Sequence, residues 1–498
     1  MLLASLQVQS SLDDARKRWI LALTCLAQFM VILDVSVVNV ALPSIRNDLH
    51  FSAVNLQWIV NAYTLTFAGF LLLGGRAADL LGRRRVFLFG LLGFAAASLV
   101  GGLSTSQEML IGARAVQGLG GAIVAPATLA IITTTFAEGY ERSRALAYWG
   151  AMGAVGGSTG VLLGGVLTEL LGWQWILFIN VPVGIAGAIG AVRFIPESTA
   201  DDIGERHYDV SGALAVTAGL VLLTFAIVRT DVNGWGSTST LLVGGAGLAL
   251  LGVFLAIERR ARRPLMPLRI FASRTLTAAN LVIFTLGASV FAMWYFVSLY
   301  LQQVLDFTPI EAGLSFVPKT GAIIDASTFA GRLATRVGPG RVLAAGMAIV
   351  GVGMLLFTRI SPTGSYLGDV LAPGVITTTG VGLAFVPTTI AAMAGVERSD
   401  AGLASGLVNT SRQVGGSIGL AVLATLATQR TQDLAHGGAI DAGALTGGFQ
   451  RAFLVGALFA FAGAVIAAAL LIRVRQPRPS GAPAPAAAGG GAPASSER

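Results

Sequence analysis

The sequence comprises 498 residues, of which 54% are hydrophobic and only 12% are charged. Soluble globular proteins carry about 25% charged residues, so this composition excludes an ordinary soluble protein. The net charge of +8 does not indicate nucleic-acid binding, because the arginines lie between apolar blocks rather than on one basic surface.

Fourteen apolar blocks follow one another along the chain, most of them close to the ~20 residues that a helix needs to cross a bilayer. Transmembrane β-barrels need short alternating segments, which this sequence lacks. We therefore predict an all-α polytopic membrane protein. In chain order the blocks cover residues 19–42, 53–75, 86–105, 109–136, 145–170, 175–192, 210–228, 240–257, 277–301, 310–331, 342–358, 367–394, 402–428 and 451–472.

Basic residues are distributed unequally between the two sets of connecting loops. Of the 33 Lys and Arg residues, 25 fall on one face, five on the other and three inside the blocks. Because positively charged loops stay in the cytoplasm, the first face is predicted to be cytoplasmic. The first block has no cleavage site after it, so we expect an uncleaved helix. The even number of spans then leaves both termini in the cytoplasm, with the chain in the inner (plasma) membrane.

A repeated loop sequence divides the chain in two. Residues 75–85 (GRAADLLGRRR) follow the second block and residues 331–341 (GRLATRVGPGR) follow the tenth, with identity at positions one, two, four, eight and eleven. Two unrelated Gly/Arg-rich turns are the alternative explanation. Duplicated bundles around a midplane site are typical of alternating-access carriers. We predict an N-terminal six-helix bundle (1–195), two inserted helices (196–275), a C-terminal six-helix bundle (276–475) and a disordered Pro/Ala/Gly-rich tail (476–498).

Five sequence motifs follow one another in the first half of the chain, each within a span or at one end of it. They are residues 33–43 (LDVSVVNVALP), 75–85, 114–120 (RAVQGLG), 156–165 (GGSTGVLLGG) and 173–182 (WQWILFINVP). In this combination the chain resembles the major facilitator superfamily, specifically its fourteen-helix drug:proton antiporters. The resemblance covers all but the tail. It implies a major facilitator fold of two six-helix bundles plus two inserted helices, and proton-driven export of lipophilic compounds that we expect to be cationic.

Asp34 and Arg114 are the candidate proton-coupling residues. A charged side chain at the centre of a membrane helix costs about 2.5–3.5 kcal/mol on insertion scales, so such residues are functional candidates. Arg114 needs a partner, and Asp34 is the available acid in the same half. A pair that separates when Asp34 is protonated would act as a switch, whereas a fixed structural ion pair is the alternative. The resemblance implies proton coupling at Asp34.

Asp325 is the candidate acid for a cationic substrate, because it lies near the middle of the tenth block. Lys319 precedes it by six residues, which on a helix gives about 9 Å of rise and a rotation of roughly 120°. The two side chains therefore do not share a face, although a salt bridge through other groups would reduce the attraction for cations. Aromatic residues can stack on a planar or cationic ligand, or instead form an interfacial belt. The aromatic candidates are Trp58, Tyr63, Trp294 and Tyr295.

Candidate gating residues belong to the loop motif and to the fifth block. Asp79 and the arginines after it are expected to latch the cytoplasmic loop, and the second copy has Thr335 in place of Asp79. Small residues at regular helical spacing let backbones approach and slide, although close packing alone would also explain them. Val161 stands where the fifth-helix motif usually has proline. The gating candidates are Gly75, Asp79, Gly82, Arg83, Arg84, Arg85, Gly160, Gly164 and Gly165.

Other classes of function lack their characteristic residues. The chain has only two lysines and no phosphate-binding loop, so ATP hydrolysis is unsupported. Its three histidines fall in loops and Cys25 is the only cysteine, so neither an enzyme site, a metal site nor a cofactor is predicted. A channel would not need the duplicated loop. The remaining alternatives are a proton-coupled importer of a small organic solute and an exporter of one self-made metabolite.

Overall fold

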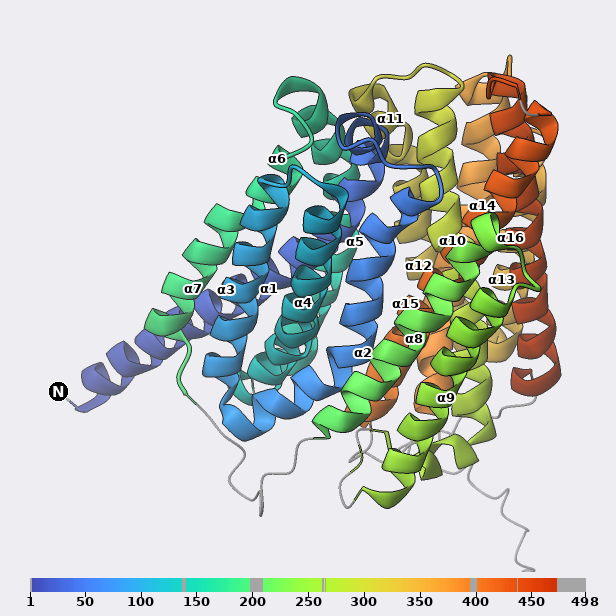
Figure 1. The fold of residues 1–498 in the computed structure, drawn as a ribbon. Coiled ribbons are helices and arrows are strands. Elements are labelled where there is room, and N and C mark those ends of the chain that lie inside the picture. Colours follow the sequence, from blue (N-terminus) through green and yellow to red (C-terminus); the bar gives the residue numbers. More distant parts are fainter. Residues whose placement is uncertain are drawn as a thin grey trace, which may run out of the picture.

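The computed structural model describes residues 2–136, 140–197, 209–261, 264, 266–394, 401–436 and 438–472. These residues form long helices without any strand, and the helices lie side by side in one helical body (Figure 1). The predicted tail lies outside the described residues. We call the end of the molecule at the top of Figure 1 the α11 end, and the opposite end, where residues 75–85 lie, the loop-motif end.

The first six predicted spans form the N-terminal bundle. Gly82 separates its second and third helices with a φ of 104°, a conformation that favours glycine. The sixth span is divided into two helices. In order, the elements are α1 (Leu2–Asp48), η1 (Asn55–Gln57), α2 (Trp58–Leu81), α3 (Arg83–Gly102), α4 (Gln107–Thr135), α5 (Tyr140–Leu170), α6 (Trp175–Phe178) and α7 (Asn180–Phe194).

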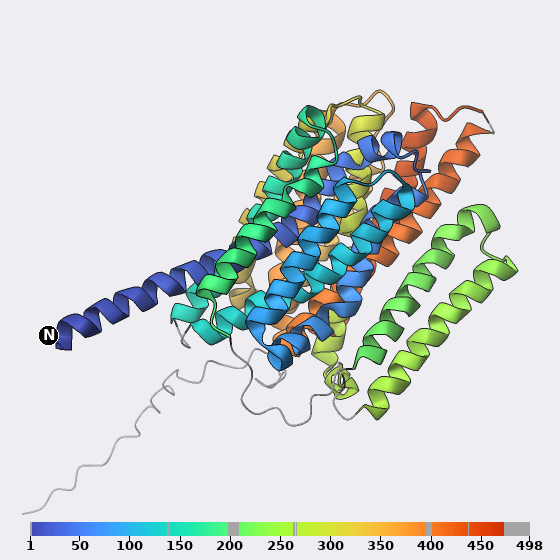
Figure 2. The ribbon, with the colours of Figure 1, turned by 60° about the vertical axis from the view of Figure 1, so that its left-hand side comes forward.

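Two helices follow as a hairpin, α8 (Val210–Asn233) and α9 (Thr238–Arg260). Asp209 and Ser237 cap their first turns, and Gly234 ends α8 with a φ of 79°. Figure 2 shows this hairpin on one side of the molecule, and α8 packs against α2 and a helix of the second bundle. The same view shows the beginning of α1 extending away from the other helices.

The C-terminal bundle repeats the arrangement of the first. Gly338, at the position of the second loop copy that matches Gly82, also has a positive φ, 91°. Phe316 separates two helices within the tenth predicted span. The elements are η2 (Leu268–Ala272), α10 (Arg274–Gln303), α11 (Pro309–Ser315), α12 (Val317–Val337), α13 (Pro339–Phe357), the π-helical η3 (Tyr366–Leu371), α14 (Ala372–Met393), α15 (Ala401–Ala435) and α16 (Ala442–Leu471).

The predicted fold class is confirmed, with fourteen spanning segments in two bundles and an inserted pair. Twelve helices of the described residues are long and apolar enough to cross a membrane. The segments at α12 and α15 complete the set but carry more polar side chains, including Lys319 and Arg412. The last helix begins at Ala442 rather than at residue 451, because the Asp441 side chain accepts a hydrogen bond from the Ala444 amide and caps it. The domain boundaries themselves stay predictions.

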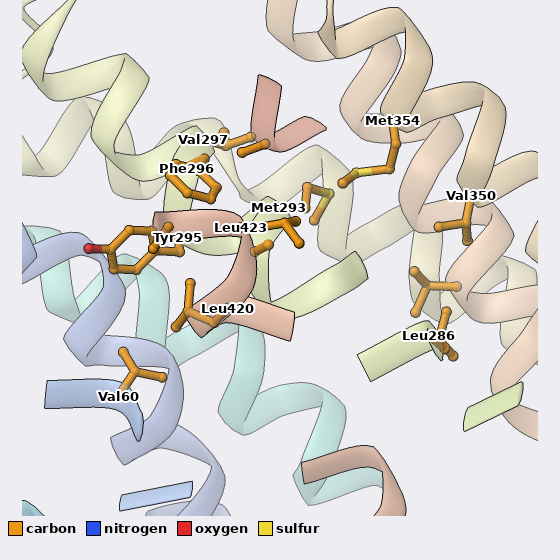
Figure 3. Close-up of a cluster of buried hydrophobic side chains, with 14 of the residues drawn as sticks. Val60, Leu286, Met293, Tyr295, Phe296, Val297, Val350, Met354, Leu420 and Leu423 are labelled. Carbon is orange, nitrogen blue, oxygen red and sulfur yellow. The ribbon is translucent and has the colours of Figure 1, made fainter. Parts of the chain in front are cut away.

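The largest buried apolar cluster crosses from one bundle to the other. It joins Val37 of α1 and Val60 of α2 to Tyr295 of α10 and Leu420 of α15. Figure 3 shows part of this cluster, in which Val60 lies on the same side as Tyr295 and Leu420. The bundles therefore share an apolar contact in this conformation.

Candidate proton-coupling site

The predicted charge pair forms in the middle of the N-terminal bundle. Arg114 of α4 donates from Nη1 to Oδ2 of Asp34 in α1, at 2.6 Å. The two side chains are 2% and 0% exposed, so water does not screen the pair. The Arg114 Nε donates to the Ile59 carbonyl oxygen of α2 at 3.1 Å. The arginine therefore ties three helices together.

Two amides and one hydroxyl complete the site around the other carboxylate oxygen. Oδ1 of Asp34 accepts from Gln117 Nε2 at 2.6 Å and from Asn180 Nδ2 at 2.9 Å. Both amides also donate to Oγ of Ser98, each at 3.0 Å. Ser98 in turn donates to the carbonyl oxygen of Leu177 at 2.8 Å. The network thus joins α1, α3, α4 and the broken sixth span.

Every group that contacts the Asp34 carboxylate is a hydrogen-bond donor. This arrangement fits an ionised carboxylate, which only accepts hydrogen bonds. A proton on Oδ2 would face the Arg114 guanidinium, which has no acceptor, and would remove the charge that holds the arginine. The observed contacts therefore fit the ionised form of Asp34.

Tyr63 lies directly beside the charge pair. Its ring centroid is 4.5 Å from the Arg114 guanidinium carbon, which is within the range of a cation–π contact. The buried hydroxyls of Tyr63 and Tyr295 have no hydrogen-bond partner among the described residues. In Figure 3 the hydroxyl of Tyr295 points toward the blue ribbon of the N-terminal bundle. Tyr295 thus holds an unused polar atom between the bundles, whereas the unused hydroxyl of Tyr63 lies inside the N-terminal bundle, beside the charge pair.

The other three predicted substrate-binding residues lie apart from the charge pair. Asp325 is exposed on α12, and its carboxylate has no hydrogen bond or ion pair among the described residues, whereas its backbone carbonyl oxygen accepts from Thr328. Trp294 is half-buried on α10 and stacks on Phe316 at 4.8 Å between ring centroids. Trp58 packs against Phe225 of the inserted helix α8 at 6.3 Å. The aromatic candidates therefore do not form one cage.

Hydrogen bonds join the two bundles at the α11 end. Ser298 and Gln302 of α10 donate to backbone carbonyl oxygens of α1, at 2.7 and 3.0 Å. The Ile310 amide of α11 donates to Glu169 of α5 at 2.9 Å. Ser417 of α15 donates to Asn61 of α2 at 2.9 Å. This end of the bundle is closed.

The fifth-helix glycines contact two different partners. A Cβ at Gly160 would lie 2.8 Å from the Leu33 carbonyl oxygen, and one at Gly164 would lie 2.7 Å from that of Val37, so both glycines let α5 approach α1. Gly165 instead faces the other bundle, where a Cβ would clash with the Pro309 carbonyl oxygen. Gly165 is therefore the glycine of this motif that permits the contact between bundles.

The loop motif makes its contacts within the N-terminal bundle. The Nε atoms of Arg84 and Arg85 lie 3.6 and 3.5 Å from Oε2 of Glu197, and a Cβ on Gly82 would clash with the same carboxylate. Arg84 also donates to the Ile195 carbonyl oxygen at 3.3 Å. The side chain of Asp79 lies outside the described residues, so its predicted latch stays a prediction. Gly75 lies against Pro126 of α4, and Arg83 is the first residue of α3.

Four residues of these sites were not among the sequence candidates. Gln117 and Asn180 lie inside quoted motifs, so their positions were marked although their roles were not. Ser98 and Glu197 had no such signal, since an isolated serine and a loop glutamate are common. Among the described residues, no group of three or more His, Cys, Asp or Glu side chains is placed to hold a metal ion.

The profile of the Major Facilitator Superfamily matches residues 24–420. The chain belongs to this superfamily. It is therefore a multi-pass membrane transporter. The chain is 44% identical to the cephamycin export protein of Amycolatopsis lactamdurans over 408 residues, which are 82% of this chain and 84% of the relative. It is 38% identical to the puromycin resistance protein of Streptomyces alboniger over 421 residues, 84% and 83% of the two chains.

Solved structures share the fold of this major facilitator. The POT family transporter PepTSo matches with a TM-score of 0.67 and 16% identity, covering 92% of this chain and 97% of the other. At this level of identity the match concerns the fold alone. The two-bundle arrangement is thus common to both proteins.

Proposed function

We propose that this major facilitator is a proton-driven exporter of lipophilic, drug-like compounds, in which Asp34 and Arg114 couple proton entry to export. The observation that carries the proposal is the fully buried carboxylate whose contacts are all hydrogen-bond donors. The names of the relatives, which describe antibiotic export and resistance, support export. The chain acts as a transporter rather than an enzyme.

The proposed orientation follows from the distribution of arginines. The basic loops, with the loop motif, face the cytoplasm, so both termini lie there and the α11 end faces outward from the inner membrane. The described conformation is then closed to the outside. Opening this end brings water and a proton to Asp34. Protonation releases Arg114, and return to the closed state delivers the proton to the cytoplasm while a new compound binds.

Asp325 is proposed to attract a cationic group of the compound. Its carboxylate is exposed and has no hydrogen bond or ion pair among the described residues, so it is available to a ligand. The unused hydroxyl of Tyr295 is proposed to bind a polar atom of the compound between the bundles, and that of Tyr63 a polar atom beside the charge pair. Partners of the protein are thus the compound, protons and the lipid bilayer.

The test is ethidium accumulation in everted membrane vesicles from a host without other efflux pumps. The native chain is expected to accumulate ethidium when respiration acidifies the lumen, and a protonophore should abolish the accumulation. Asp34→Asn should reduce it to the protonophore level, because the variant cannot release a proton. Asp48→Asn is the matched control, since Asp48 ends the same helix and accepts from Trp173 at the α11 end.

Two results would contradict the proposal. Full accumulation by Asp34→Asn would show that the coupling proton binds elsewhere. Loss of ethidium from preloaded vesicles on energisation would show that compound and proton move in the same direction, as in an importer.

A further inference from the structure

Lys319, in the first turn of α12, has a buried ammonium group without a hydrogen-bond acceptor in the part of the chain that the structure describes. It is 0% exposed, and its Nζ has no partner among the described residues. The ammonium lies 4.1 Å from the centroid of Phe316 and 5.8 Å from that of Tyr366. Cation–π contacts stabilise the charge but accept no conventional hydrogen bond. Three strong donor positions therefore remain unused.

Aromatic side chains from three elements surround Lys319. Phe316 stacks on Trp294 of α10, which is half-buried and lies on the α10 face that also carries Ser298, the residue bonded to α1. Tyr366 belongs to the π-helical segment η3 and is held by its hydroxyl, which donates to the Ser315 carbonyl oxygen at 2.8 Å. Single π-helical turns often occur at functional sites.

The stem of Lys319 is accommodated by a glycine. A Cβ on Gly374 of α14 would lie 2.8 Å from Cε of Lys319 and 2.9 Å from Cδ. Any larger residue at this position would displace the lysine. The close approach fixes the ammonium between the two aromatic rings.

No acid of the described residues neutralises this cation. Asp325 is exposed about 9 Å further along α12 and on a different face. Asp369 of η3 accepts a hydrogen bond from the Ser365 amide at 2.7 Å. The helix dipole adds to the positive potential, since Lys319 lies at the N-terminal end of α12, where an anion and not a cation is favoured.

A second basic side chain of this bundle, the half-buried Arg412 of α15, adds to the imbalance. It donates to the side-chain oxygen of Asn409 at 2.9 Å and lies 5.8 Å from the Phe385 ring centroid, and the described structure gives it no ion pair. The described C-terminal bundle therefore holds one buried and one half-buried basic side chain without a paired carboxylate.

We propose that Lys319 binds an acidic group, such as a carboxylate, of the transported compound, with Trp294 and Phe316 stacking on its adjacent apolar part. This inference rests on the proposed export function and extends its substrate class to lipophilic acids and zwitterions. The acid enters from the side of Trp294, and it supplies the acceptor that Lys319 lacks. Phe316 stands at the break between α11 and α12.

The test compares a lipophilic acid with its neutral ester. Pyrenebutyrate and pyrenebutyrate methyl ester are titrated onto the full-length protein in nanodiscs, with energy transfer from tryptophan as the signal. The native chain is expected to bind the acid about tenfold more tightly than the ester, because the ammonium forms a charge-assisted hydrogen bond. Lys319→Met should bind both compounds equally, and Lys319→Arg should keep the preference.

Lys17→Met is the matched control, because Lys17 is the only other lysine and pairs with Glu141 at 2.9 Å, far from α12. It should keep the preference for the acid. A native chain without that preference, or a Lys319→Met variant that retains it, overturns the proposal. If Lys319→Met does not fold, the test rests on the native chain and Lys319→Arg. Both must bind the acid more tightly than the ester, and failure of either overturns the proposal.

The proposed function is tested separately from this site. Asp34→Asn should abolish proton-driven ethidium accumulation and still bind the acid more tightly than the ester. Loss of the acid preference with intact accumulation refutes only the Lys319 site. Absence of gradient-driven transport in the native chain, with the acid preference retained, refutes only the coupling.

Discussion

Arg114 in the N-terminal bundle and Lys319 in the C-terminal bundle are both buried cations against an aromatic ring, yet only Arg114 has a carboxylate partner. The sequence offset between the two loop copies relates Lys319 to Tyr63, the ring that contacts Arg114, and not to Arg114 itself. At this repeat position one bundle has the aromatic ring and the other has the cation. The comparison shows that each bundle buries a basic side chain against an aromatic ring, with a carboxylate present in one case and absent in the other among the described residues.

The largest effect is expected from removing the partnered cation. Arg114→Met leaves Asp34 buried without its counter-charge, which should lower the free energy of unfolding by about 3–5 kcal/mol. Denaturant unfolding of the protein in detergent measures this change. The double variant Asp34→Asn, Arg114→Met should be less destabilised than the single one, because no charge is left unpaired. Additive losses in the double variant would show that the two side chains do not interact.

The same substitution in the other bundle should have the opposite sign. Lys319→Met removes an ammonium that no acid neutralises, and an apolar side chain of similar length can occupy the space against Gly374. We expect unfolding to become more difficult by about 1 kcal/mol. Thermal unfolding in detergent measures the shift. If Lys319→Met instead lowered the free energy of unfolding as much as Arg114→Met, Lys319 would have a buried counter-charge. The contrast between the two bundles would then be wrong.

A third effect is expected where the bundles touch, on the balance between conformations rather than on unfolding. Gly165→Val places a side chain against the Pro309 carbonyl oxygen, and such overpacking costs typically 1–3 kcal/mol, here only in the closed state. Ile310→Cys, in a Cys25→Ser background, should then react several-fold faster with an external impermeant maleimide. Gly153→Val is the matched control, since nothing lies within 4 Å of its Cβ position. Equal labelling rates in both variants would show that Gly165 does not influence closure of the α11 end.

The sequence predicted the membrane helices well, because length and apolarity decide where a chain crosses a bilayer. It also predicted the pairing of Asp34 with Arg114, since a charge in the membrane must find a partner and few were available. It did not predict that Lys319 would be completely buried without one. Which face of a helix turns inward depends on packing against distant elements such as Gly374, and no local pattern contains that information.

The ionic partner of the loop arginines could not be predicted from the sequence either. The positive charge of residues 83–85 is explained by membrane orientation. Their partner is Glu197, which follows Arg84 and Arg85 by more than a hundred residues. Its role depends on how the sixth span returns to the start of α3. Asn180 and Ser98 joined the charge pair for a similar reason, since three separate helices had to converge before their side chains could meet.

Ser98 has one hydroxyl hydrogen, which it gives to Leu177, while its oxygen accepts from both Gln117 and Asn180. Its bonding capacity is thereby used up, and the hydroxyl has no freedom to reorient when a neighbour changes. Any rearrangement beside it must move both amides at once. Through this one hydroxyl and the Asp34 carboxylate, direct hydrogen bonds link α1, α3, α4 and the broken sixth span.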